Sequence, residues 1–132
     1  MLHREITQNV INAAHGVHED LGQGFSADIY TAALGVEFAA LGVDCQRNLE
    51  QAIVFREETV GHVTIPLLVQ DVVVVYVVEE SSIPRTAYAQ TRSLMTAADS
   101  PLGMILGFGG KRLDVRRVEA TSREDSEQDD NE

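Results

Sequence analysis

The order of apolar and polar positions predicts two helices in the first third of the chain. Residues 3–21 carry apolar side chains three or four positions apart, the spacing of one helical face, and Gly22 and Gly24 follow as helix-ending residues. Ser26 is a suitable N-cap for a second helix, which we expect to continue to about Leu41. The expected apolar positions of this second helix are Ile29, Ala33, Val36 and Ala40.

The rest of the chain contains five segments of strand character and one more helix. Apolar runs and alternating stretches predict strands over residues 45–55, 61–69, 72–79, 103–110 and 112–119. The third helix opens near Pro84, and residues 99–101 end it. We expect the first three strands to form an antiparallel meander. The order α-α-β-β-β-α-β-β predicts an α/β (α+β) fold, in which helices pack on a central mixed sheet.

The segment from Val60 to Glu79 is the centre of this predicted sheet. Its second half, Val72–Val78, is apolar at successive positions, which is typical of a strand that is covered on both faces. Pro66 lies inside the first half, an unusual place because proline has no N–H to donate to a strand ladder. A turn at residues 70–71 joins the two halves.

Length and composition narrow the range of possible functions. The chain has 132 residues, the size of one ordinary domain, which we assign to residues 1–120. No segment has the ~18 consecutive apolar residues of a membrane span, and the first residues lack the layout of a signal peptide. The single cysteine, Cys45, suits a reducing compartment. We therefore expect a cytoplasmic protein.

The chain is acidic throughout. Its formal net charge is −11, from 10 basic and 21 acidic residues. Residues 121–132 hold six acids and one arginine, a net −5, and we expect this tail to be disordered. The remaining −6 makes nucleic acid an unlikely partner, because it is bound mainly through Lys and Arg. The basic residues that do cluster are Lys111, Arg112, Arg116 and Arg117. They leave a local basic patch open, although a solvated edge strand is the stronger interpretation.

Two histidines, His15 and His18, are three residues apart on the first expected helix. This spacing could hold a metal ion, but no cysteine or third ligand is placed beside them by spacing. We predict no metal site and no cofactor. No small-molecule substrate is predicted either.

Several blocks of the sequence resemble the GxxExxY proteins, small bacterial members of the PD-(D/E)XK nuclease superfamily. The blocks are V-H-E-D-L-G-Q-G-F-S-A-D-I-Y (17–30), V-G-H-V-T-I-P-L-L-V (60–69), A-Q (89–90) and G-M-I-L-G-F-G-G-K-R-L-D-V-R-R-V (103–118). The resemblance covers about residues 3–118 and implies the superfamily's α-β-β-β-α-β core, in agreement with the order obtained from periodicity. The residues that match the family pattern are His18, Gly24, Tyr30 and Gln90.

The resemblance also implies four catalytic positions, and none of them keeps its catalytic residue. The glutamate of the Gly-x-x-Glu-x-x-Tyr signature is replaced by Ala27. The position of the metal-binding aspartate holds Pro66. Tyr76 and Val78 stand where the family has the glutamate and lysine of a Glu-x-Lys triplet. Hydrolysis of a phosphodiester with Mg²⁺ needs converging carboxylates, and a lysine assists it. We therefore predict a pseudo-nuclease without catalytic residues.

Two expectations follow from these replacements. The first is that the Tyr76 ring and the Val78 side chain fill the former cleft beneath the second helix. The second is that the protein acts by self-association, as a structural homo-oligomer that could take the form of a large closed or filamentous assembly. Two alternatives remain open at this stage: a non-cleaving nucleic-acid-binding or regulatory protein, and a residual Mg²⁺-dependent nuclease. The latter would use other acids, which are Glu79 or the pair Glu19 and Asp20.

Overall fold

The computed structural model describes residues 3–120, which form three helices and five strands in the predicted order. The elements are α1 (Arg4–Leu21), α2 (Ala27–Ala40), β1 (Cys45–Phe55), β2 (Glu58–Val69), β3 (Val73–Val78), α3 (Arg85–Ala98), β4 (Leu102–Gly107) and β5 (Asp114–Glu119). The acidic tail that we expect to be disordered, residues 121–132, lies outside the described residues. None of the described helices is both long and apolar enough to cross a bilayer.

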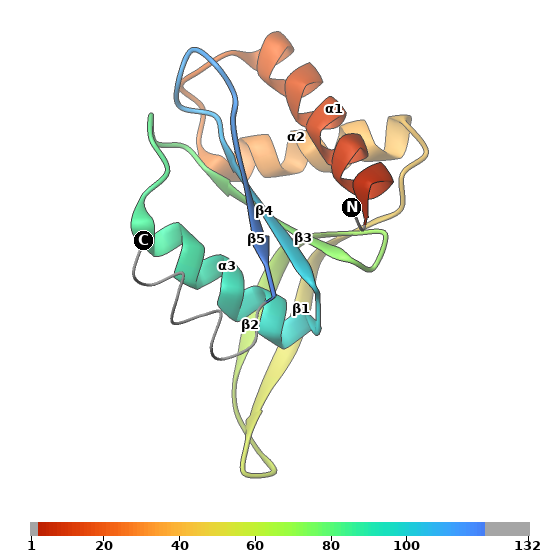
Figure 1. Ribbon diagram of the computed structural model, residues 1–132, viewed down its shortest axis with the longest axis vertical. Coiled ribbons are helices and arrows are strands. Elements are labelled where there is room, and N and C mark those ends of the chain that lie inside the picture. The colour runs from red at the N-terminus through yellow and green to blue at the C-terminus, as the bar shows by residue number, and fades with distance from the viewer. Residues whose placement is uncertain (1–2, 121–132) are drawn as a thin grey trace.

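The five strands form one mixed sheet, as the sequence predicts. Their spatial order is β1-β2-β3-β4-β5, and every neighbouring pair is antiparallel except β3 and β4. A parallel pair needs a crossover connection, and α3 provides it. Helices α1 and α2 lie together on one side of the sheet and α3 lies on the other (Figure 1). The meander β1-β2-β3 and the mixed α+β architecture are therefore confirmed.

The apolar strand β3 supplies residues to two cores. Val73, Val75 and Val77 pack with the residues of α1 and α2, whereas Val74 and Val78 pack with those of α3. This is the alternation of a strand whose two faces are both covered, because successive side chains point to opposite sides.

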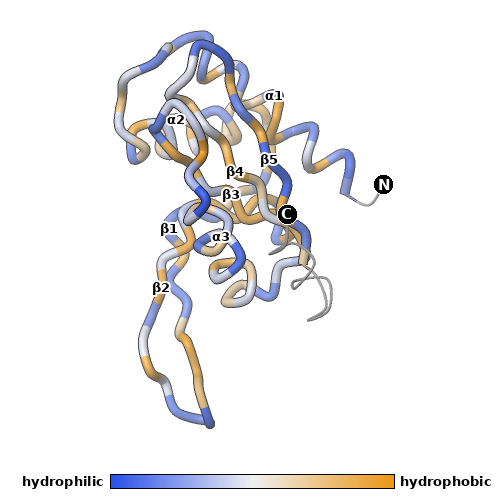
Figure 2. Tube along the Cα trace, turned by 60° about the vertical axis from the view of Figure 1, so that its left-hand side comes forward, coloured by the Kyte–Doolittle hydropathy of each residue, from blue (hydrophilic) through white to orange (hydrophobic). Residues whose placement is uncertain are grey.

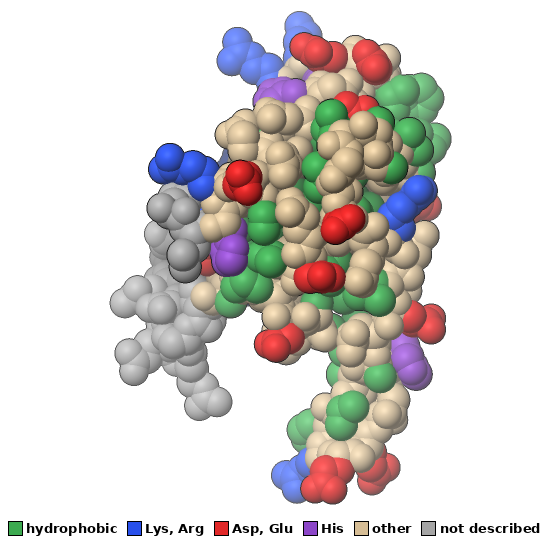
Figure 3. Space-filling model, turned by 90° about the vertical axis from the view of Figure 1, so that its right-hand side faces the viewer, with side chains coloured by type: hydrophobic (Ala, Val, Ile, Leu, Met, Phe, Trp, Pro, Cys, Tyr) green, Lys and Arg blue, Asp and Glu red, His purple; other side chains and the backbone are tan. Residues whose placement is uncertain are grey.

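Strands β1 and β2 extend beyond the body as a long hairpin, which we call the arm (Figures 1 and 2). Strand β2 begins at Glu58, three residues earlier than predicted, because the turn consists only of Arg56 and Glu57. Both residues have positive φ angles, 51° and 67°, which is the geometry of a tight two-residue hairpin turn. Apolar side chains near the tip are exposed, and green side chains are visible on this hairpin below the body (Figure 3).

Pro66 is accommodated by an irregularity in the strand pairing. The ladder pairs Arg47 with Leu67 and Leu49 with Ile65, but it does not pair Asn48 with Pro66 between them. Asn48 has a left-handed backbone with φ 53°. The missing N–H of the proline therefore falls at a point where the ladder makes no bond.

One expectation about α2 is wrong. The periodicity of the sequence suggests Ile29 and Val36 as members of the apolar face, yet these side chains are 46% and 63% exposed. The buried face instead carries Tyr30, Leu34 and Phe38. Helix α2 carries apolar residues on both its inner and its outer face, so the spacing of its apolar residues does not identify the side that faces the core.

Candidate functional site

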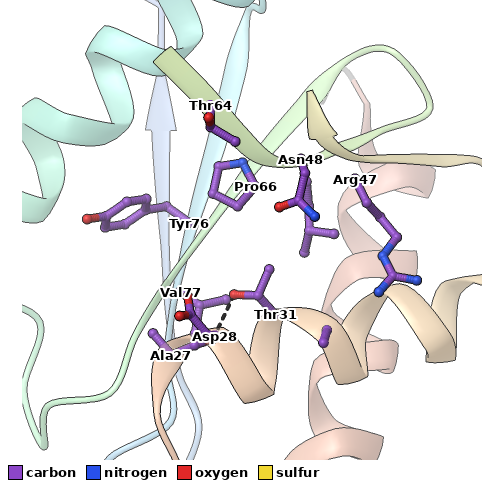
Figure 4. Close-up of a pocket in the computed structure, with 11 residues that line it drawn as sticks. Ala27, Asp28, Thr31, Arg47, Asn48, Thr64, Pro66, Tyr76 and Val77 are labelled. Carbon is purple, nitrogen blue, oxygen red and sulfur yellow. Dashed lines mark hydrogen bonds between the residues drawn. The ribbon is translucent and has the colours of Figure 1, made fainter. Parts of the chain in front are cut away.

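A cleft of about 550 Å³ opens between α2 and the strands β1, β2 and β3. Helix α2 forms one wall, and the base of the arm forms the other (Figure 4). Its lining residues are Ala27, Asp28, Thr31, Ala32, Arg47, Asn48, Thr64, Pro66, Leu67, Tyr76 and Val77. Three of the four positions that the family resemblance assigns to catalysis, Ala27, Pro66 and Tyr76, line this cleft from three separate elements.

The fourth position, Val78, does not line the cleft. Its side chain is 5% exposed and packs in the apolar cluster on the α3 side of the sheet. The Tyr76 ring points away from Arg47 and Asn48 (Figure 4), and its hydroxyl donates to Oε1 of Gln90 at 2.6 Å. The expectation that Tyr76 and Val78 fill the cleft is therefore wrong. Residues 76 and 78 share the strand face that α3 covers, so the space beneath α2 stays open.

The cleft contains one side chain of each charge. The exposed carboxylate of Asp28 comes from the first turn of α2, and the exposed guanidinium of Arg47 comes from β1. The hydroxyl of Thr31 donates to the Ala27 carbonyl at 2.8 Å, within the helix. In residues 3–120 no group of three His, Cys, Asp or Glu side chains is close enough to hold a metal ion. The lining side chains do not fit Mg²⁺, which prefers several oxygen ligands and usually more than one carboxylate.

A family model described as the PD-(D/E)XK nuclease superfamily matches residues 4–118. The chain belongs to this superfamily. The crystal structure of SSO0001 has the same fold, with a TM-score of 0.56 at 13% sequence identity. The match covers 92% of this chain and 61% of SSO0001, so the present chain spans less than two thirds of that protein. Proteins with curated descriptions gave no significant match.

In this superfamily member, Glu79 caps the helix that borders the cleft. Ser26 stands at the N-cap of α2 but makes no side-chain cap bond. The Glu79 carboxylate accepts a hydrogen bond of 2.6 Å from the Ala27 N–H instead. A carboxylate is favourable there because the N-terminus of a helix carries a partial positive charge. Glu79 is thus engaged with the backbone, not combined with a second acid.

Three of the residues that match the family pattern make structural contacts in or beside the connection between α1 and α2. Gly24 has φ 107°, a backbone conformation that favours glycine. The Tyr30 hydroxyl donates to the Gly22 carbonyl at 2.5 Å and accepts from the Phe25 N–H at 3.2 Å. His18 Nε2 lies 3.1 Å from the Gly110 carbonyl oxygen, which draws the end of α1 to the loop after β4. These contacts account for the three residues as parts of the scaffold.

The environment of Tyr76 also differs from that of a catalytic acid. Partial burial is the main cause that raises the pKa of its phenol, and the charge of Glu80 raises it further. The hydroxyl therefore stays protonated at neutral pH and serves as the donor to Gln90.

The basic residues near the end of the chain lie on β5 and on the loop before it. Arg116 and Arg117 are neighbours on β5, so their side chains leave opposite faces of the strand. Each is paired with an acid two residues away: Arg116 Nε lies 2.8 Å from Asp114, and Arg117 Nη2 lies 3.3 Å from Glu119. Strand β5 is an edge of the sheet, in agreement with the edge-strand interpretation. Lys111 and Arg112 are exposed in the preceding loop.

Sequence reasoning missed several residues of the cleft. Arg47, Asn48 and Thr64 belong to strands whose crossing beneath α2 cannot be inferred from periodicity. Gly35 was a partial signal, because a glycine inside a helix often marks a close approach. A Cβ atom at Gly35 would lie 2.6 Å from Arg47 Nε, so the arginine stem lies directly on α2.

Proposed function

We propose that this chain is a non-cleaving protein of the nuclease fold that acts by self-association. The observation that carries the proposal is the large apolar surface that remains exposed on the described residues. Seven large apolar side chains are 43–63% exposed, and they lie along α2 and near the arm tip. They are Phe25, Ile29, Val36, Leu41, Val54, Phe55 and Val60. Large exposed apolar patches mark interaction surfaces.

The composition of the cleft supports the non-cleaving part of the proposal. Cleavage of a phosphodiester with metal ions needs carboxylates that converge on Mg²⁺. Asp28 is the one carboxylate among the lining residues, and Ala27, Pro66 and Tyr76 bring no metal ligand of the required kind. The alternative acids that we considered do not replace them, because Glu79 caps α2 and Glu19 and Asp20 do not line the cleft.

The charge of the protein argues against association with nucleic acid. The body carries a net negative charge, and the two arginines of β5 are already paired with acids. Phosphate binding requires cations that are free to displace counterions. Apolar contact between copies, by contrast, gains from every exposed apolar side chain that it covers.

The association is tested by size-exclusion chromatography with light scattering on the full chain, from about 1 to 100 µM. We expect a mass that exceeds one chain and rises with concentration. A constant monomer mass across this range refutes the proposed self-association. The subunit number follows from the plateau mass, and negative-stain microscopy then separates a closed assembly from a filament.

The absence of cleavage is tested separately, by incubating labelled single- and double-stranded DNA and RNA with the protein and Mg²⁺ or Mn²⁺. We expect no products above those of the buffer. Products that disappear on chelation, and that co-purify with the protein through two different columns, refute the non-cleaving assignment. The variant Asp28→Asn is the control, since it removes the carboxylate of the cleft.

A further inference from the structure

Helix α2 presents a second apolar face to solvent in addition to its core face. This outer face consists of Phe25, Ile29, Ala32, Val36 and Ala39, which we call the α2 stripe. Phe25 directly precedes the N-cap, and the other four lie in the helix. All five are exposed. The successive spacings of 4, 3, 4 and 3 residues are those of the a and d positions of a heptad repeat, which pairs one helix with another.

We propose that the α2 stripe packs in antiparallel fashion against the same stripe of a second copy, about a two-fold axis near Ala32. This inference rests on the proposed self-association and assigns its interface. An isologous contact uses the same patch on both subunits, so a single stripe is sufficient. Ala32 and Ala39 are small, which lets the two helices approach to about 8 Å, the lower end of helix-packing distances. The antiparallel arrangement also places the N-terminus of each helix beside the C-terminus of the other.

Charge complementarity supports this arrangement. Asp28 and Arg47 are exposed, and neither has an ion-pair partner among residues 3–120. Both lie on the cleft side of the stripe, since Arg47 packs on Gly35 (Figure 4). Asp28 lies four residues before Ala32, and Gly35 lies three residues after it. In an antiparallel pair of helices, the cleft side of one stripe faces the cleft side of the other. The two-fold axis therefore brings Asp28 of each copy beside Arg47 of the other, which gives two such contacts.

The available area is compatible with a reversible dimer. The three large side chains of the stripe are 43–63% exposed, and full burial of an aromatic side chain such as that of Phe25 covers about 150–250 Å². With the exposed alanines and the charged flank, the pair would bury roughly 1,000 Å² in total, the lower limit of specific interfaces. We therefore expect dissociation in the micromolar range, so the assembly depends on concentration.

The decisive experiment compares two valine variants of the full chain. Val36→Glu places a carboxylate in the α2 stripe, and Val54→Glu makes the same change on the arm at nearly the same exposure, 63% against 61%. Light scattering at 50 µM is expected to show a monomer for Val36→Glu and the wild-type mass for Val54→Glu. Circular dichroism checks that both remain folded, as expected for exposed sites.

The outcomes separate the interface from the proposed function. If the wild type associates and only the Val54→Glu variant is a monomer, the proposed self-association stands, but the α2 stripe is refuted as its interface. The arm is then the interface. If the wild type is a monomer at every concentration, both proposals fail. Dissociation by Val36→Glu alone supports the stripe.

Two further variants test the axis and the charges. In a Cys45→Ser background, Ala32→Cys is expected to form a disulfide-linked dimer under mild oxidation, because the two Ala32 positions meet at the axis. The matched Val54→Cys variant is expected to stay monomeric on a non-reducing gel. Asp28→Arg and Arg47→Glu should each weaken association at least tenfold, and the double variant should restore it. Failure of Ala32→Cys to cross-link, or of the double variant to recover, refutes the antiparallel arrangement.

Discussion

The hydroxyl of Tyr30 gives a sharp test of whether a residue that matches the nuclease pattern has a structural role. The ring is fully buried and stacks on Phe108, with ring centres 4.4 Å apart. The hydroxyl joins two backbone groups of the loop between α1 and α2, the Gly22 carbonyl at 2.5 Å and the Phe25 N–H at 3.2 Å. Tyr30→Phe removes this bridge and leaves the ring in place.

The expected cost follows from the two lost hydrogen bonds. Each contributes about 0.5–1.5 kcal/mol net, and a polar group left unpaired in a buried position costs about 1–3 kcal/mol. We expect Tyr30→Phe to lower the free energy of unfolding by about 2 kcal/mol. For a domain of this size that corresponds to a decrease of roughly 8 °C in the melting temperature.

The assay is urea unfolding followed by circular dichroism, at one fixed protein concentration because association would contribute to stability. Tyr76→Phe is the matched control: it loses one hydrogen bond to the exposed Gln90, so less than about 1 kcal/mol is expected. If Tyr30→Phe is as stable as the wild type, or no less stable than Tyr76→Phe, the structural role assigned to the hydroxyl is wrong.

Four further predictions concern packing, reactivity and binding. Gly109→Ala should lower the free energy of unfolding, measured in urea, by about 1–3 kcal/mol, because the added Cβ would clash with the Glu80 carbonyl oxygen. Gly110→Ala should be tolerated, because the nearest atom to its Cβ lies 3.4 Å away. Burial raises the pKa of the Cys45 thiol above its ordinary value, so its reaction rate with a disulfide reagent should reach half its maximum at a higher pH in the folded protein than in urea. The neutral thiol is favoured in the fold, so this group's contribution to stability is fully present below the pKa of the unfolded chain and is lost as pH rises through the higher pKa of the folded protein. Val78→Lys should lower the free energy of unfolding by at least about 3 kcal/mol, because it buries an ammonium group in the apolar cluster beside α3. If this variant is as stable as the wild type, position 78 faces the cleft instead. The paired arginines of β5 predict no mobility shift of duplex DNA at ~50 mM salt, and a shift that weakens as salt increases would contradict this.

The architecture could be predicted because hydrophobic periodicity is strong where the strands are buried. The continuous apolar run Val73–Val78 can satisfy both of its faces only in the middle of a covered sheet, and the structure places it there. Short polar or glycine-rich segments separate the elements, so the order of helices and strands along the chain can also be predicted from the sequence. The sequence predicts a longer turn than the two residues Arg56 and Glu57, because neither residue type commonly adopts a positive φ angle.

The shape of the site could not be predicted in the same way. The sequence aligns Tyr76 and Val78 with catalytic positions, but it does not contain the angle at which β1 and β2 pass beneath α2. That angle leaves the cleft open and brings Arg47 onto Gly35 from a strand that no catalytic pattern includes. A long-range crossing depends on the packing of the whole sheet, which local spacing does not record.

Helix α2 connects this limit with the proposed function. Its amphipathic period is absent because both of its faces are apolar, and for that reason the sequence suggested Ile29 and Val36 for the core. In a monomer these side chains gain little from folding, since burial of such a side chain contributes about 1.5–3 kcal/mol only when water is excluded from it. A helix that serves the core alone would carry polar residues at these positions. The proposed contact between molecules would account for this outer face, and we expect Val36→Glu to remove that contact while Tyr30, Leu34 and Phe38 keep the inner face in place.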